Sequence, residues 1–394
     1  GAVYGYGTDL YNGHTMMGSP PLYGGYEYTP LEMNRRADVP LVKKNNEALL
    51  MLPRIFTEQK GFSAAITDPS WGNYAGFCDL SFISPFPKIN GYQTIGRYAA
   101  LWKKEHWTEG GIGDDGKILE RNLLFFSFFR QSPIALRQML YKKGTYWSSD
   151  SESGNVKIVL DNYSALDYLK RLTSISDTEN GSYVCMVNEL THENLLLQAP
   201  DYIPVKKVTN KGTSKYKENL DYHTQIAALK MLGSWLDFLK ENGIYDNTRI
   251  VIVSDHGCNG YEDDIEPDAE LDSQIAGGKY EGRGHYHPLL LFKDFNASGK
   301  LTEDDTFMTN TDTPSLLLKG LVENPVNPFT GKIVPLDTHA LKKDGVIISI
   351  SDRHQPAMNG KYKFNIPYSH WWKVKDNIFK ASSWSRPTEK EIQQ

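Results

Sequence analysis

Cysteine, long apolar runs and clustered positive charge are all scarce in this sequence. The 394 residues include three cysteines, Cys78, Cys185 and Cys258, at wide spacing and with no Cys-x-x-Cys motif. An odd count at such spacing disfavours a disulfide scaffold and a thiolate zinc site, although one isolated disulfide bond remains compatible with it. The apolar run at residues 123–129 is far too short to span a bilayer. No signal peptide is recognisable at residues 1–30.

Charge and composition narrow the class of protein further. The sequence has 43 basic and 48 acidic residues, which gives a net charge of −5, and no basic stripe. This balance argues against nucleic acid as the main partner. Apolar residues make up 40% of the chain and aromatic residues 12%, which is typical of a globular protein and not of a disordered one.

Helical and strand patterns alternate along the middle of the chain. Residues 1–40 are rich in glycine, tyrosine and proline and predict a loop, whereas 44–59 predict a helix. The apolar runs 183–187 and 250–253 predict strands buried on both faces. A long helix predicted at 221–242 ends at a glycine just before the second of these strands. A helix, a glycine and a buried strand form half of a crossover unit, so we expect an α/β fold with a mostly parallel main sheet.

The remaining segments predict helices and a second sheet. Residues 119–142 predict a buried helix interrupted by a proline, and 157–160 predict a short strand. Near the C-terminus, apolar runs at 346–350 and 362–366 flank an Asn-Gly turn, which indicates a small antiparallel sheet.

This change of pattern gives the expected domain division. We predict a large domain over residues 1–340 and a small β-rich subdomain over residues 341–394.

The strongest chemical signal is Ser254-Asp255-His256-Gly257, directly after the predicted strand 250–253. In a parallel sheet the carboxyl ends of the strands face the ligand crevice. A carboxylate and an imidazole placed there can bind one divalent cation, since both are normal ligands of zinc and acceptable ligands of manganese. Gly257 would let the backbone come close. The alternative is an ordinary loop in which Asp255 caps a turn.

Together with Tyr245-Asp246-Asn247-Thr248 before the strand, this motif resembles the alkaline phosphatase superfamily. Its sulfatase-like branch, near lipoteichoic acid synthases and phosphoglycerol or phosphoethanolamine transferases, is the most similar. The resemblance extends over about residues 12–320. It implies a mostly parallel central sheet with helices on both faces and a catalytic domain at residues 1–340. It also implies that Asp255 and His256 bind one catalytic zinc or manganese ion.

The segment Gly13-His14-Thr15-Met16-Met17-Gly18-Ser19-Pro20 resembles the nucleophile segment of the transferases. The resemblance implies that Thr15 is the nucleophile and a further metal ligand, at a helix N-terminus whose N–H groups stabilise a charged centre. Ser19 is the second candidate, and an ordinary capping threonine is the alternative. No cysteine lies in this segment, so the formylglycine chemistry of true sulfatases has no residue to act on.

Histidines after or before strands are the other candidates. His192 follows the strand 183–187, and the resemblance implies a general acid or base at the leaving oxygen. Arg283, His285 and His287 precede an apolar run, where the resemblance implies a late histidine at the metal or substrate. We expect His285 and Arg283 to be substrate-binding residues, the arginine through a phosphate. In an extended segment His285 and His287 would share one face. The alternative is a surface position for each.

The sequence departs from the family at its beginning. Family members carry an acidic metal ligand at the end of a first strand, well before the nucleophile, whereas only Asp9 precedes Thr15 here. Either the sequence begins after that strand or the ligand is missing. In the related transferases, transmembrane helices that precede the catalytic domain anchor it to the membrane. The resemblance therefore implies a membrane anchor outside this chain. It also implies a location in the cell envelope, on the extracytoplasmic side of the membrane.

These observations predict a metal-dependent phosphotransferase or phosphodiesterase. The expected substrate is a phospholipid head group of the phosphoglycerol or phosphoethanolamine type. Thr15 would form a phospho-threonine intermediate, His192 would protonate the leaving alcohol, and a glycan hydroxyl or water would release the phosphoryl group. The alternatives are a sulfatase, a non-catalytic descendant that binds glycan or lipid, and a metal-independent structural module.

Overall fold

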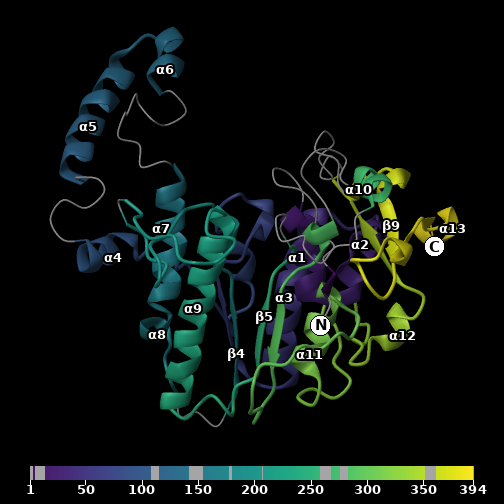
Figure 1. Cartoon of the computed structure of the whole chain (residues 1–394). Coiled ribbons are helices and arrows are strands. Elements are labelled where there is room, and N and C mark those ends of the chain that lie inside the picture. Colours follow the sequence, from purple (N-terminus) through teal and green to yellow (C-terminus); the bar gives the residue numbers. More distant parts are fainter. Residues whose placement is uncertain are drawn as a thin grey trace. The chain divides into compact units, whose positions relative to one another are not determined.

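The computed structural model describes residues 3–4, 14–107, 115–141, 154–176, 180–205, 207–257, 268–275, 283–350 and 361–393. These residues form a mixed α/β fold, as predicted (Figure 1). The chain divides into two compact units. Unit 1 comprises Gly1–Tyr92, Asp177–Met186 and Ile244–Gln394, and unit 2 comprises Gln93–Ser176 and Val187–Gly243.

Unit 1 contains both helices and strands. Its α-helices are α1 (His14–Gly24), α2 (Pro30–Arg35), α3 (Leu41–Gln59), α10 (Ala269–Ile275), α11 (Thr313–Leu318), α12 (His339–Lys342) and α13 (Glu389–Gln393). Its strands are β1 (Val3–Tyr4), β2 (Ser63–Thr67), β3 (Ile89–Tyr92), β4 (Ser182–Met186), β5 (Ile250–Val253), β6 (Leu290–Lys293), β7 (Met308–Thr309), β8 (Val346–Ser349), β9 (Trp371–Val374) and β10 (Trp384–Ser385). Its short 3₁₀ turns are η1 (Gly25–Tyr28), η2 (Gly72–Tyr74), η3 (Ser81–Ile83), η7 (Arg283–Tyr286), η8 (Asn310–Asp312), η9 (Tyr368–His370) and η10 (Ala381–Ser383).

A parallel sheet of three strands, in the order β3-β2-β4, carries the main core of unit 1. Ala64 in the central strand pairs with Ile89 on one side and Tyr183 on the other. Helix α3 packs against all three strands. Its apolar residues recur at helical spacing, and the side chains of Leu52 and Ile55 are fully buried. The parallel sheet expected from the sequence is therefore present among the described residues.

The pairing of β5 differs from the crossover expected for it. Strand β5 pairs antiparallel with β6, and Val253 lies opposite Leu290. The apolar run of β5 does not specify whether its neighbour runs parallel or antiparallel to it. Here the later strand β6 turns back beside β5. The consequence is that the residues after β5 lie beside the residues before β6.

The N-terminal part of unit 1 is helical where a loop was predicted. Helices α1 and α2 occupy much of residues 14–35, and Met16, Met17 and Leu22 of α1 are buried. Burial against α3 and α11 stabilises α1 in spite of its two prolines. Before α1, strand β1 pairs parallel with β7, so residues 3 and 308 are partners.

The predicted C-terminal antiparallel sheet is confirmed, with one strand in a different place. Strands β8, β9 and β10 form it in the order β10-β9-β8. The predicted second strand at 362–366 is not a strand; Trp371–Val374 takes its place. The reason is burial, because Trp371, Trp372 and Val374 supply a more apolar run for the core. The Asn359–Gly360 turn lies outside the described residues. The boundary predicted at residue 340 stays a prediction, and the two compact units follow a different division.

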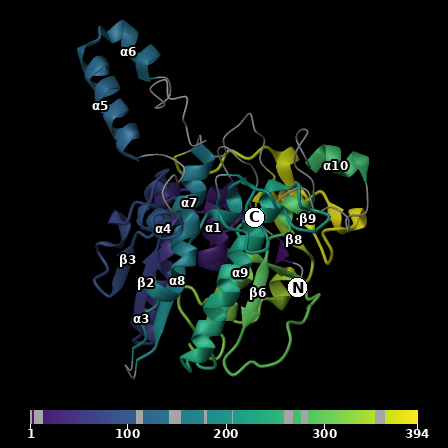
Figure 2. The same cartoon turned by 60° about the vertical axis from the view of Figure 1, so that its left-hand side comes forward.

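Unit 2 is mainly helical (Figure 2). Its helices are α4 (Ala99–His106), α5 (Asp115–Gln131), α6 (Ile134–Tyr141), α7 (Gly154–Asp167), α8 (Leu169–Leu172) and α9 (Leu220–Glu241), with the 3₁₀ turn η5 (Leu190–His192). Helix α7 packs against α4 and α9. The strand predicted at 157–160 is wrong, because this run is part of α7, and Val159, Leu160 and Tyr163 bury one helical face. The side chain of Asn219 caps α9 by accepting hydrogen bonds from the N–H groups of Asp221 and Tyr222.

The segment predicted as a buried helix at 119–142 forms α5 and α6, which are separated at Pro133. The prediction of burial is wrong for the side chains that the structure describes there, since most of them are exposed. In the described part of the chain, no helix is both long enough and apolar enough to cross a membrane.

Candidate active site

The candidate site of unit 1 begins where β5 ends. One carboxylate oxygen of Asp255 accepts a hydrogen bond from the N–H of His256 at 3.1 Å. The other carboxylate oxygen lies 3.9 Å from Nε2 of His256. A metal ion bonds to such oxygen and nitrogen atoms at about 2.0–2.2 Å, so one ion can contact both. The structure therefore brings the two predicted ligands together.

The orientation of His256 also fits metal binding. Its Nδ1 lies 2.7 Å from the carbonyl oxygen of Gly257. A carbonyl only accepts, so Nδ1 carries the proton in this hydrogen bond and Nε2 carries the lone pair of the neutral ring. This arrangement is common for metal-binding histidines, whose second nitrogen is held by a backbone carbonyl or a carboxylate.

His285 stacks on His256, with ring centroids 4.6 Å apart and an angle of 16° between the rings. The antiparallel register explains the contact, because His285 lies just before β6 and His256 just after β5. The segment is the turn η7 and not extended, so His285 and His287 do not share a face as expected; His287 lies against the edge of Phe379 instead. Burial, with a smaller contribution from the charge of His256, lowers the pKa of His285 to about 3. His285 is therefore a neutral ring near physiological pH.

Gly257 lies at a close approach between two backbone segments. Its N–H donates to the carbonyl of His285 at 2.8 Å. A Cβ atom at this position would lie 2.6 Å from the carbonyl oxygen of His287 and closer still to that of Gly284. Both neighbours are backbone atoms, so the contact leaves no room for a side chain. This confirms that a glycine lets the backbone come close here.

Asn310, in η8, is a site residue that sequence reasoning missed. Its side-chain Nδ2 donates to the backbone carbonyl of Asp255 at 2.6 Å, and the residue is fully buried. Its Oδ1 is a buried acceptor with no hydrogen-bond partner among the described residues. The one sequence signal near it is Asp312, whose position in Thr311-Asp312-Thr313-Pro314 is typical of a helix N-cap. The side chain of Asp312 does not cap the following helix α11; it accepts from the N–H of Thr309 in a capping box around η8 and pairs with Lys342.

The side chains at the end of β5 supply some, but not all, of the ligands that a metal ion needs. Among the described residues, no group of three or more His, Cys, Asp or Glu side chains is arranged to hold one. Asp255 and His256 supply two suitable ligands, and the buried Oδ1 of Asn310 is an unsatisfied acceptor close to the Asp255 backbone. Asp9 and Cys258 lie outside the described residues. Asp255 and His256 therefore fit a metal ion as two of its ligands, and no third His, Cys, Asp or Glu ligand lies beside them among the described residues.

Thr15 lies in the first turn of α1 and is half-buried. Helix α1 packs against η8, which contains Asn310, and Asn310 holds the Asp255 backbone. The turn η8 thus links the predicted nucleophile segment with the predicted metal ligands. Ser19, the second candidate, is buried on the next turn of α1. The exposure of the two hydroxyls favours Thr15 over Ser19.

Arg283 is completely buried, and its guanidinium group is used within unit 1. Its Nε donates to Asp272 at 2.9 Å and its Nη1 to the carbonyl of Phe379 at 2.8 Å. These contacts join α10 to the segment before η10. The predicted contact with a substrate phosphate stays a prediction, and we leave Arg283 out of the proposed site.

His192 belongs to unit 2, at the end of η5. Its side chain is half exposed, and its Nδ1 lies 3.4 Å from a carboxylate oxygen of Glu193. Asp221, at the start of α9, has its pKa raised by burial and lowered by the charge of His192. The predicted role of His192 as general acid stays a prediction.

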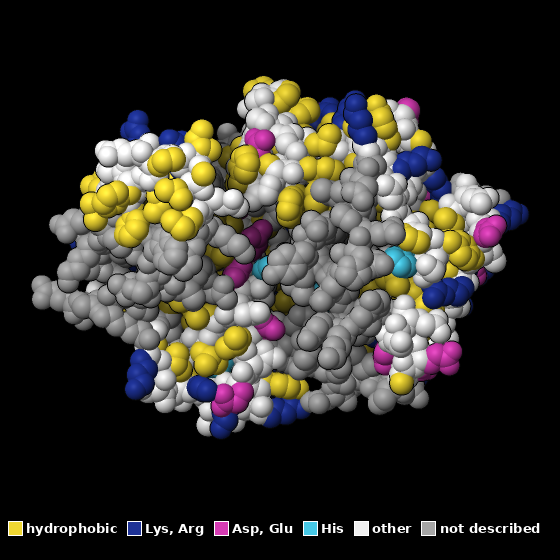
Figure 3. Space-filling model, turned by 90° about the horizontal axis from the view of Figure 1, so that it is seen from above, with side chains coloured by type: hydrophobic (Ala, Val, Ile, Leu, Met, Phe, Trp, Pro, Cys, Tyr) yellow, Lys and Arg dark blue, Asp and Glu magenta, His cyan; other side chains and the backbone are white. Residues whose placement is uncertain are grey.

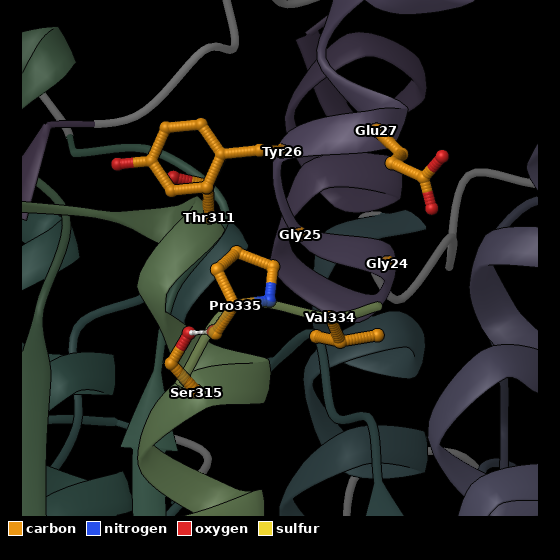
Figure 4. A pocket seen from close by; sticks show the side chains of 8 residues that line it. All are labelled: Gly24, Gly25, Tyr26, Glu27, Thr311, Ser315, Val334 and Pro335. Carbon is orange, nitrogen blue, oxygen red and sulfur yellow. Dashed lines mark hydrogen bonds between the residues drawn. The ribbon is translucent and has the colours of Figure 1, made fainter. Parts of the chain in front are cut away.

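A small hollow lies beside η8 and is lined by residues 24–27, Thr311, Ser315, Val334 and Pro335 (Figure 4). The hydroxyl of Ser315 donates to the carbonyl of Pro335 at 2.6 Å. The hollow has room for about one water molecule. It is too small for a phosphate ester.

Comparisons with solved structures find two proteins of low sequence identity. The lipoteichoic acid synthase LtaP from Listeria monocytogenes aligns over 100% of this chain and 78% of its own, at 12% identity and a TM-score of 0.42. An alkaline phosphatase superfamily protein from Vibrio parahaemolyticus aligns over 100% of this chain and 74% of its own, at 10% identity and a TM-score of 0.38. No family model and no curated protein matches the sequence.

Proposed function

We propose that this chain is a metal-dependent phosphotransferase or phosphodiesterase that acts on a phospho-head-group. The observation that carries the proposal is the pair Asp255 and His256 at the end of β5, with an oxygen and a lone-pair nitrogen within reach of one ion. We further propose that Thr15 contributes its hydroxyl to the same site. The proposed place of action is the cell envelope, by analogy with the transferases that the motifs resemble.

A divalent ion held by Asp255 and His256 would supply positive charge next to the reacting phosphate. The Thr15 hydroxyl gives its proton to solvent and its oxygen attacks phosphorus, the bond from phosphorus to the leaving alcohol breaks, and the alcohol oxygen takes up a proton. The N–H groups in the first turn of α1 lack partners within the helix and can bind a phosphoryl oxygen. A second alcohol or water then takes the phosphoryl group from Thr15. The sequence predicts His192 as the proton donor.

The first test is the metal content of the purified chain, measured by plasma mass spectrometry after incubation with zinc or manganese and removal of excess ion. We expect bound metal that is lost in Asp255→Ala and His256→Ala. Asp305→Ala, at an exposed carboxylate in unit 1, is the matched control and should keep the metal.

The second test is turnover of a phosphodiester and of a sulfate ester by the same preparations. We expect phosphodiester turnover that Thr15→Ala abolishes while metal binding falls by less than in Asp255→Ala. Faster turnover of the sulfate ester would favour a sulfatase. Absence of both metal and turnover would contradict an enzymatic role and favour a binding protein.

A further inference from the structure

The α5–α6 hairpin of unit 2 has an unusual distribution of apolar side chains. In α5 the exposed fraction is 57% for Leu123, 56% for Leu124 and 55% for Phe128. In α6 it is 82% for Ile134 and 45% for Leu136. Hydrophobic side chains also gather at the left-hand end of the space-filling view, where Figure 1 shows α5 and α6 (Figure 3). Contiguous exposed apolar surface of this kind marks an interaction site.

The arrangement around α5 favours an apolar medium over a flat protein partner. Six of the seven residues at 123–129 are apolar, the exception being Ser127. With 3.6 residues per turn, seven consecutive residues cover the whole circumference of a helix. A protein partner covers one face of a helix, whereas a helix that is apolar on all sides is found in a core or in lipid.

Three polar side chains of the hairpin find hydrogen-bond partners within it, which suits an apolar medium. The hydroxyl of Ser127 donates to the carbonyl of Leu123 at 2.8 Å, and that of Ser132 to the carbonyl of Phe128 at 2.6 Å. Arg137 donates to the carbonyls of Ser132 and Arg130, at the C-terminal end of α5. These carbonyls would otherwise lack partners at a helix end.

The charge of the hairpin indicates the kind of apolar medium. Residues 123–140 contain two arginines, Arg130 and Arg137, and no acidic residue, although the chain as a whole has a net charge of −5. Arginine beside phenylalanine and leucine is typical of helices that lie in the interface of an anionic membrane. Helix α5 has 17 residues and is about 25 Å long at about 1.5 Å per residue. Neither helix of the hairpin qualifies as a membrane span.

We infer that the α5–α6 hairpin inserts its apolar side chains into the surface of an anionic phospholipid bilayer. The arginines lie at the level of the head groups, and the leucine and phenylalanine side chains reach the acyl chains. This contact is separate from the membrane anchor that the family resemblance implies. It requires neither a metal ion nor catalysis, so it can fail or succeed independently of the proposed function.

The test is co-sedimentation of the full chain with vesicles, followed by peptide-level hydrogen exchange. We expect binding to vesicles of phosphatidylglycerol and phosphatidylcholine, at least about fivefold tighter than to phosphatidylcholine alone, since each arginine near an anionic surface contributes about 1 kcal/mol. Bound chain should exchange more slowly at residues 123–140. The double variant Leu124→Ser/Phe128→Ser should lose about tenfold or more in affinity. Arg130→Gln should weaken binding to anionic vesicles only.

The matched control is Phe77→Ser in unit 1, where the phenylalanine is 74% exposed. It should bind vesicles like the unaltered chain. Circular dichroism should show all variants folded, and the single variant Phe128→Ser replaces the double one if that fails to fold. No binding to anionic vesicles, or an equal loss in Phe77→Ser, overturns the inference. So does a dimer in light scattering that the double variant converts to monomer without any vesicle binding, because the hairpin would then be a protein interface.

Discussion

Side-chain packing differs between two regions of the molecule, the segment that follows β5 and the α5–α6 hairpin. After β5, a single added carbon at Gly257 would meet two backbone carbonyls, and Asn310 holds the Asp255 backbone from a fully buried position. In the hairpin, large apolar side chains lie at the surface. Close packing fixes the position of polar atoms, as a metal or phosphate site requires. Exposed apolar surface is suited instead to contact with another apolar phase.

Within these two regions, the largest effect should come from filling the space at Gly257. We expect Gly257→Ala to lower the free energy of unfolding by about 1–3 kcal/mol or more, because the neighbouring backbone atoms cannot move away cheaply. Bound metal should fall with it. Gly233→Ala is the control, since Gly233 lies inside α9 with open space around it and alanine there should stabilise by about 0.5–1 kcal/mol. Urea unfolding followed by circular dichroism measures both, and equal effects would contradict the close approach.

A smaller effect is expected from Asn310→Ala. The substitution leaves the Asp255 carbonyl without its donor but also removes the unsatisfied Oδ1, so the two changes offset and we expect a loss of about 1 kcal/mol. Its consequence for the site should be larger, since groups that orient metal ligands change metal affinity by about 10–100-fold. Titration with a metal indicator measures this change. An affinity equal to that of the unaltered chain would mean that Asn310 does not position Asp255.

The smallest effect on stability is expected in the hairpin. We expect Phe128→Ala to change the free energy of unfolding by less than about 0.5 kcal/mol, because exposed side chains contribute little. The same substitution at buried Phe56, in α3, should cost about 3–5 kcal/mol. Thermal unfolding of the two variants compares them directly. A large loss in Phe128→Ala would show that the hairpin is covered by other parts of the chain.

Local patterns in the sequence predict the β5 end of the candidate site. An apolar run followed by Asp255, His256 and Gly257 was sufficient, since strand, ligand types and glycine are all adjacent in the chain. The stacking of His285 and the donor from Asn310 were not predictable, because both depend on which strands pair and in which direction. Pairing of that kind is set by packing over the whole unit and not by the run itself.

The sequence also did not reveal whether a segment is buried or exposed. The prolines and glycines before residue 31 predicted a loop, yet burial of Met16 and Met17 against neighbouring helices stabilises α1. In residues 123–140 the helices and their separation at Pro133 follow from the pattern, but their exposure does not. Apolar spacing shows that a segment needs an apolar neighbour and leaves open whether that neighbour is the protein's own core.

The pairing of β1 with β7 has a consequence for synthesis on the ribosome. Residue 3 finds its partner only after residue 308 has emerged, and β4 must return to β2 after the first segment of unit 2 has been made. Unit 2, in contrast, is complete once residue 243 has been translated. The nascent chain would therefore carry a complete unit 2 before the late strands of unit 1 are made, a period in which the unpaired apolar strands of unit 1 are exposed to aggregation.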